Sequence, residues 1–191
     1  MKILIASDSF KHSLSSFLVG KSLAAGIKKV FQEAEINLSP VADGGEGTVQ
    51  ALTDATGGKM VQARVHDPLM RKITASFGIL GDGKTAIIEM ASASGIELLK
   101  PEERDHLKTT TYGTGELIKA ALDHHCSRII LGIGGSATID GGAGLLNALG
   151  VEFLSSENET ILPSGGNLNQ IHSLNIDRLD ARLNNTPIRI G

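Results

Sequence analysis

The chain has 191 residues, a net charge of −3 and only 3% aromatic residues, with no tryptophan. It therefore lacks both the basic surface and the stacking rings that nucleic-acid-binding proteins use, and we expect no nucleic-acid partner. Cys126 is the single cysteine, which excludes an internal disulfide and favours a reducing, cytoplasmic location. The apolar run at the N-terminus is interrupted by Asp8, so it is too short for a secretory signal. No apolar segment is long enough to span a membrane, so we expect no membrane partner.

The first third of the chain alternates apolar runs, polar loops and helical periodicity, which is typical of α/β units. We expect a strand at Lys2–Ala6, a helix over residues 14–34 that begins at Ser13 or Ser15, a second strand at Leu38–Ala42, and a helix from Thr48 to about Ala55 that closes at Gly57-Gly58.

The spacing of apolar residues then changes to the alternation typical of strands, and we expect strands at Met60–His66, Ile73–Leu80 and Thr85–Met90. Gly81-Asp82-Gly83 is expected to form a hairpin between the last two. Helical periodicity resumes at Thr114–His125. The strand Arg128–Ile133 is rich in β-branched residues, as in a parallel sheet buried on both faces, and a short helix and a final half-strand at Pro187–Gly191 follow. These elements predict an α/β fold: a parallel-sheet, Rossmann- or flavodoxin-like domain at residues 1–70 and a second α/β domain at residues 71–191.

Three loops share one design, in which an apolar strand ends in glycines, small hydroxyls and an acidic residue before a helix begins. They are Ser7–Lys11, Asp43–Thr48 and Gly132–Gly142. Such loops meet at the carboxyl edge of an α/β sheet, where glycine lets backbone N–H groups approach a phosphate. A carboxylate in the same loop would hold Mg²⁺ or accept a proton, so the loops together favour a magnesium-dependent phosphoryl-transfer site.

A dinucleotide site is the rival interpretation of the third loop. Gly132-x-Gly134-x-x-Ala137 matches the dinucleotide fingerprint in its variant with alanine at the third position. Asp140 stands just beyond the fingerprint, however, and Glu152, the acidic residue about 20 positions on, falls in a predicted strand. A Walker sequence is absent, so a kinase with this sequence would not be a P-loop kinase.

The hydroxyl-rich stretch Thr109–Gly115 has two interpretations. Its backbone N–H and hydroxyl groups could bind phosphate or sugar-acid oxygens, or Thr114 could simply cap a helix with Glu116 in its first turn. Both interpretations stay open, because caps and anion sites use the same residue types. Glu89, near the end of its strand, could ligate a metal or face solvent, and we expect it to face solvent.

Several of these segments together resemble the bacterial glycerate kinase family, type 1, which has no P-loop. The matching segments are Ile5-Ala6-Ser7-Asp8-Ser9-Phe10-Lys11, residues 40–48, 77–81 and 88–91, Thr109-Thr110-Thr111-Tyr112-Gly113-Thr114-Gly115-Glu116, and residues 132–138. Ser7 departs from the family, which often has proline there, and Ile139 replaces a frequent asparagine.

The resemblance implies ATP- and Mg²⁺-dependent phosphorylation of D-glycerate, to 2-phosphoglycerate in many members and 3-phosphoglycerate in others. It also implies an active site between two α/β domains. Family members continue well past the position of Gly191, so the resemblance covers the N-terminal half of such a kinase and implies that the second domain is incomplete.

The strand-end loops give specific hypotheses for the site. Asp43, helped by Glu46, would orient or deprotonate the attacking hydroxyl, and Lys11 would hold the glycerate carboxylate. The substrate-binding residues would be Asp8, Ser9, Lys11, Thr110 and Thr111. The nucleotide would contact Gly113, Thr114, Gly134, Gly135 and Ser136. Asp140 would be the metal ligand.

Two alternatives to an active kinase remain: a truncated, non-catalytic fragment that only binds ligand, and a dinucleotide-binding oxidoreductase. The oligomeric state is left open, and a homo-oligomer is compatible with the sequence.

Overall fold

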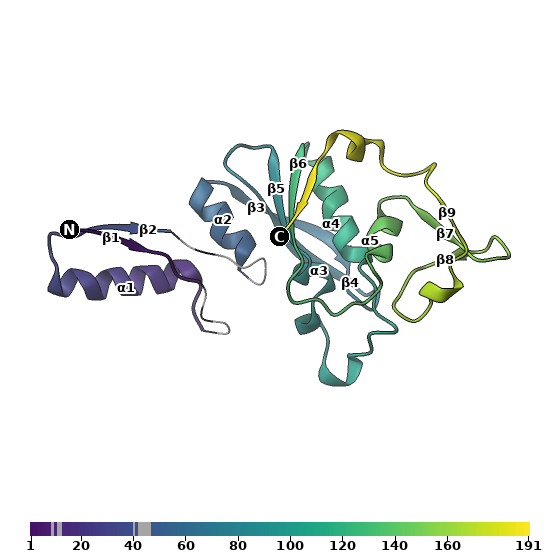
Figure 1. The fold of residues 1–191 in the computed structure, drawn as a ribbon, viewed down its shortest axis with the longest axis horizontal. Coiled ribbons are helices and arrows are strands. Elements are labelled where there is room, and N and C mark those ends of the chain that lie inside the picture. Colours follow the sequence, from purple (N-terminus) through teal and green to yellow (C-terminus); the bar gives the residue numbers. More distant parts are fainter. Residues whose placement is uncertain (9, 11–12, 40, 42–46) are drawn as a thin grey trace.

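The computed structural model describes residues 1–8, 10, 13–39, 41 and 47–191. Its first part is a strand–helix–strand unit, which lies apart from the larger body of the molecule in Figure 1. Strand β1 (Lys2–Ile5) pairs in parallel with β2 (Glu35–Leu38), and helix α1 (Ser16–Val30) connects them. The Ser15 hydroxyl accepts a hydrogen bond from the N–H of Leu18 at 3.4 Å, which confirms Ser15 as the N-cap.

Strand β2 lies earlier in the chain than the predicted Leu38–Ala42. Ile36 and Leu38 are two residues apart, so their side chains lie on the same face of the strand. Leu38 packs against α1 at Gly20, which has no side chain to obstruct it. Few apolar side chains of this unit are buried. Its exposed large hydrophobic residues include Leu4, Phe17, Leu18, Leu23, Val30, Phe31 and Leu38.

The larger body is built on a five-stranded sheet in the order β10-β6-β5-β4-β3. Its strands are β3 (Lys59–His66), β4 (Lys72–Ile79), β5 (Thr85–Glu89), β6 (Arg128–Gly132) and β10 (Ile188–Ile190). The β3–β4 and β4–β5 pairs are antiparallel, whereas β6 is parallel to both β5 and β10. The predicted hairpin at residues 81–83 and the buried parallel strand near residue 130 are therefore confirmed.

Helix α2 (Thr48–Thr56) lies beside this sheet and ends at Gly57, whose φ of 67° is the left-handed conformation that closes helices. This agrees with the predicted end. The turn between β3 and β4 passes through residue 70, so the predicted domain boundary at 70/71 falls within one hairpin. The division of the chain into those two domains stays a prediction.

Helices α3 (Ala91–Ser94) and α4 (Tyr112–Asp123) pack on the sheet and on each other, and α5 (Ala143–Ala148) packs on α4 (Figure 1). The short 3₁₀ helices η1 (Ile96–Leu98) and η2 (Pro101–Glu103) lie between α3 and α4. Leu117, Ile118 and Phe77 are fully buried in the core that α4 shares with the sheet. Helix α4 begins two residues before the expected Thr114, with Thr111 at its N-cap position.

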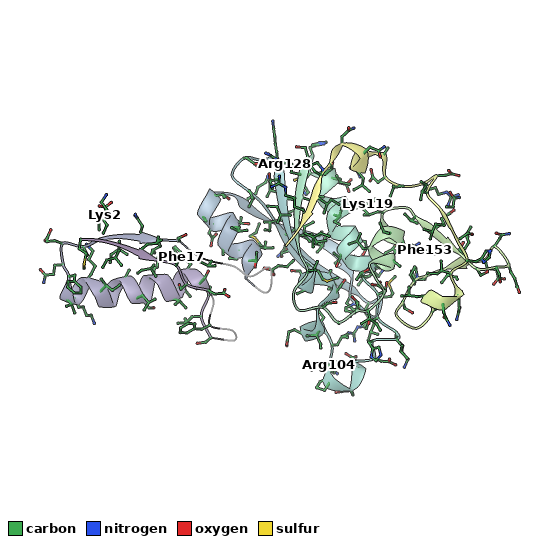
Figure 2. All side chains as sticks on the ribbon, viewed as in Figure 1. Lys2, Phe17, Arg104, Lys119, Arg128 and Phe153 are labelled. Carbon is green, nitrogen blue, oxygen red and sulfur yellow. The ribbon has the colours of Figure 1, made fainter. Side chains whose placement is uncertain are left out.

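A small antiparallel sheet, in the order β8-β7-β9, forms the far side of the body (Figure 1). Its strands are β7 (Glu152–Leu154), β8 (Thr160–Ile161) and β9 (Ser173–Asn175), with the 3₁₀ helices η3 (Leu168–Gln170) and η4 (Ala181–Asn185) nearby in the chain. Phe153, labelled in Figure 2, is buried and forms a second, smaller core with Ala143 and Val151. No helix among the described residues is long and apolar enough to cross a bilayer.

Candidate active site

The carboxyl ends of β5 and β6 lie side by side, because Glu89 is paired with Gly132 in the parallel register. The segments that follow the two strands are also joined. The N–H of Ile96 donates to the carbonyl of Gly135, and the N–H of Ala137 donates to that of Ser94, each at 2.9 Å. The predicted glycine loop is thus fixed against the segment after β5, at the edge of the sheet where α/β proteins bind ligands.

Glu89 connects this edge to a second predicted loop. Its carboxylate is only 7% exposed and accepts a hydrogen bond from the N–H of Val49, in the first turn of α2, at 2.8 Å. The expectation that Glu89 faces solvent is therefore wrong, because both faces of β5 are covered. The described end of the loop before α2 reaches the same edge of the sheet. The sequence signal for this role was a carboxylate that directly follows the apolar run Ala86–Ile88.

The glycine loop presents backbone donors that have no acceptor among the described residues. Across the parts of the chain that the structure describes, the N–H groups of Gly134, Gly135 and Ser136 donate to no acceptor. Gly135 has a φ of 71°, a left-handed conformation that would strain most other residues. Successive N–H groups around such a residue form a concave site for anions, so this loop fits the phosphate groups of a nucleotide.

Asp140 lies further along the same loop and is 1% exposed. Its Oδ2 atom accepts hydrogen bonds from the Thr111 N–H at 2.7 Å and the Thr111 hydroxyl at 2.8 Å. The Thr110 hydroxyl donates to the same atom at 3.3 Å and the Gly144 N–H at 3.1 Å, while the Gly142 N–H donates to Oδ1 at 3.2 Å. Oδ2 therefore joins the start of α5 to the start of α4, and Oδ1 accepts from the N-cap residue of α5.

These contacts do not fit a magnesium ligand, because a metal at Oδ2 would have to displace donors that are themselves buried. Among the described residues, no three His, Cys, Asp or Glu side chains form a group that could hold a metal ion. The assignment of Asp140 as the metal ligand stays a prediction.

Thr110 and Thr111, which were predicted to bind substrate, are buried, and both hydroxyls are engaged with Asp140. The Thr111 hydroxyl also accepts a hydrogen bond from the N–H of Leu145 at 2.9 Å. The structure thus gives these hydroxyls internal partners. A contact with substrate would require them to share or exchange these partners, and it stays a prediction.

Gly113 and Thr114, which were predicted to contact nucleotide, lie within α4. A Cβ at Gly113 would be 1.8 Å from the carbonyl oxygen of His66, so this glycine permits a close backbone contact. Thr114 is fully buried and its hydroxyl pairs with that of Ser94 at 2.7 Å. Both residues therefore have packing roles here, and their contact with nucleotide stays a prediction.

The remaining predicted residues are at the N-terminal end of the chain. Asp8 is half-buried and follows β1. Ser9, Lys11, Asp43 and Glu46 lie outside the described residues, so their roles stay predictions.

The dinucleotide interpretation lacks the context that it needs. In that motif the helix opens directly after the third glycine or alanine, where its N-terminus meets the pyrophosphate. Here Ala137 is followed by a turn in which the Thr138 N–H donates to the Ser136 hydroxyl at 3.0 Å, and α5 begins only at Ala143.

Comparison with known proteins gives a consistent result. The model of the glycerate kinase family matches residues 3–191. The chain is 51% identical over its whole length to a glycerate kinase of Bacillus subtilis, of which it covers 50%. It is 50% identical over its whole length to the glycerate 2-kinase of Escherichia coli, of which it also covers 50%.

A solved structure agrees with these relatives. The crystal structure described as a glycerate kinase 2 from Salmonella typhimurium LT2 superposes with a TM-score of 0.92 at 46% identity. All of this chain and 51% of the solved chain are covered. The chain therefore spans about half the length of the relatives that it matches.

Proposed function

The chain belongs to the glycerate kinase family, and from this premise we propose that it contributes to the transfer of the γ-phosphoryl group of ATP to D-glycerate. The observation that supports this best is the meeting of the glycine loop after β6, the segment after β5 and the start of α2 at one edge of the sheet. Phosphoryl transfer depends mainly on positioning and on neutralising charge, and an edge with unpaired N–H donors supplies both.

In the proposed reaction, a glycerate hydroxyl oxygen attacks the γ-phosphorus while the bond from this phosphorus to the bridging oxygen breaks. ADP and phosphoglycerate result, and the hydroxyl proton passes to Asp43. The N–H groups of Gly134, Gly135 and Ser136 hold the phosphate oxygens, and Lys11 neutralises the glycerate carboxylate, with Asp8 and Ser9 nearby. Mg²⁺, when bound, would neutralise charge on the phosphates.

The test is to incubate the purified chain with Mg-ATP and D-glycerate and to measure ADP and phosphoglycerate by mass spectrometry. A reaction without glycerate measures background ATP hydrolysis. Product that depends on glycerate and falls at least a hundredfold in Asp43→Asn would support the proposal. A folded chain that forms no product would count against an active kinase in these 191 residues and would favour the ligand-binding fragment.

The position of the phosphoryl group in the product is decided in the same experiment. The 2- and 3-phosphoglycerate isomers separate by chromatography, and the identified isomer assigns the attacking hydroxyl. A cytoplasmic location and an assembly into homo-oligomers remain parts of the proposal, and light scattering of the purified chain measures the assembly.

A further inference from the structure

A cavity of about 240 Å³ opens beside the glycine loop, between the loop and the segment that carries η1 and η2. Ser136, Thr138 and Ile139 of the loop line it, together with Ile96 and Arg104 of that segment. Arg104 is labelled in Figure 2, where its segment lies at the bottom of the larger body. Because Ser136 belongs both to this cavity and to the run of unpaired N–H donors, one ligand can reach both.

Arg104 brings a charge to the cavity that nothing in the described chain neutralises. Its guanidinium forms no ion pair there, although acidic residues flank it on both sides. Glu103 pairs with Arg71 at 2.7 Å, and Asp105 pairs with Lys108 at 3.0 Å. An exposed arginine with no carboxylate partner is available to bind the oxygens of a phosphate, for which its planar fork is well suited.

The cavity also has apolar walls that a small hydroxy acid would not use. Ile139 is 56% exposed and Ile96 is 37% exposed, and both line the cavity together with the buried Leu99. Apolar side chains around a few placed polar groups are typical of pockets for ring-shaped ligands. Glycerate has no apolar face to cover these side chains, whereas a purine base has two.

We propose that this cavity holds the adenosine part of the nucleotide. Ile96 and Ile139 cover the base, and Arg104 and the N–H groups at Gly134–Ser136 bind the phosphates at the edge of the cavity. The volume lies below the roughly 300–1,000 Å³ usual for whole drug-sized ligands, which agrees with a pocket for part of a nucleotide whose phosphates lie outside it. This inference rests on the proposed function, because it places the ATP that the reaction consumes.

The test measures binding of ADP, adenosine, inorganic tripolyphosphate and NAD to the full 191-residue chain by calorimetry. Arg104→Ala should weaken binding of ADP and tripolyphosphate by about ten- to a hundredfold and leave adenosine unchanged, since a hydrogen bond to a charged group is lost. Ile139→Ser should weaken ADP and adenosine by about tenfold and leave tripolyphosphate unchanged. Both residues are exposed, so neither change should disturb folding, and circular dichroism checks this.

Arg64→Ala is the matched control, because Arg64 is also exposed and lies on β3, away from the cavity. It should bind ADP as the wild-type chain does. Backbone amide shifts of Gly134, Gly135 and Ser136 in the ¹⁵N-labelled chain should move with ADP and not with glycerate. NAD that binds more tightly than ADP would overturn the proposal in favour of a dinucleotide site.

The proposal is also overturned if Arg104→Ala and Ile139→Ser bind ADP like the wild-type chain, or if the wild-type chain does not bind ADP, because every residue of the cavity is in this chain. The proposed function is judged separately, by the formation of phosphoglycerate. Product together with normal ADP binding by the two variants would retain the kinase and remove only the assignment of this cavity.

Discussion

The carboxylate of Glu89 lies 2.8 Å from the backbone nitrogen of Val49, although forty residues separate them in the chain. Val49 belongs to the first turn of α2, where backbone N–H groups have no partner within the helix. The N-cap residue Gly47 has no side chain that could accept a hydrogen bond from these groups. Glu89, at the end of β5, therefore caps the N-terminus of α2 with its side chain. This contact fixes the start of α2, which directly follows the predicted catalytic loop.

Replacing Glu89 tests this relationship. Glu89→Ala should lower the free energy of unfolding by about 1–3 kcal/mol, because the buried N–H of Val49 loses its acceptor. Glu89→Gln keeps an acceptor oxygen and should cost less. Urea unfolding followed by circular dichroism measures both changes. A Glu89→Ala chain as stable as the wild type would show that the contact does not support α2.

Asp140 allows the structural and the metal-binding hypotheses to be separated. Asp140→Asn should lower the free energy of unfolding by about 1–3 kcal/mol, because the new amide presents hydrogens to a site lined with donors. Thr110→Val should cost less, since it removes one hydrogen bond of 3.3 Å and leaves the other donors to Oδ2 in place. Unfolding in urea again provides the measurement.

Added Mg²⁺ decides between the two roles. If Asp140 only joins α4 to α5, millimolar Mg²⁺ without nucleotide should leave the melting temperature of the wild-type chain unchanged. If Asp140 holds the metal, Mg²⁺ should raise the melting temperature of the wild type and not that of Asp140→Asn. The second result would restore Asp140 as a metal ligand.

Much of the fold followed from local pattern. The β-branched run at Arg128–Ile133 required a strand buried on both faces, and the turn at residues 81–83 required a hairpin, because both signals are contained in a few consecutive residues. The place of the candidate site was also predicted in part, since the loop after β6 lies at the carboxyl edge of the sheet.

The roles of individual polar residues were less predictable. Glu89, Thr111 and Asp140 are buried by elements far away in sequence, so their hydrogen-bond partners could not be read from their neighbours. The role of Arg104 was also not predictable from its neighbours in sequence. Its significance depends on the neighbouring carboxylates already having other partners, which only the three-dimensional arrangement reveals.

The close packing of α4 on α5 depends on Gly115. A Cβ at this position would lie 2.3 Å from the carbonyl oxygen of Leu145 and 2.7 Å from the Cβ of Ala148. Gly115→Ala should therefore push the helices apart and lower the free energy of unfolding by about 1–3 kcal/mol. Gly26→Ala is the matched control, because Gly26 is helical and its added Cβ would meet nothing within 4 Å apart from the neighbouring backbone of its own helix. That change should stabilise α1 by up to about 1 kcal/mol, and equal effects of the two substitutions would contradict the packing argument.

Stability in acid should depend on Asp82, in the turn between β4 and β5. Hydrogen bonds from the Thr85 hydroxyl and from the N–H groups of Lys84 and Thr85, with a smaller effect of Arg128, lower the pKa of Asp82 from 3.8 to about 2. Since the pKa is lower in the folded chain than in the unfolded chain, the ionised carboxylate stabilises the fold above pH 3.8, and this contribution is lost as the pH falls towards 2.

Asp82→Asn removes this contribution, so its melting temperature should lie below that of the wild type by a constant amount at neutral pH. The difference should shrink as the pH falls below about 4 and should nearly vanish near pH 2. Thr85→Val deletes the 2.7 Å hydrogen bond that lowers the pKa most, so this variant should lose stability at a higher pH than the wild type. Melting curves between pH 2 and 6 measure all three chains. A difference between wild type and Asp82→Asn that persists unchanged at pH 2 would mean that Asp82 stabilises the turn without its charge.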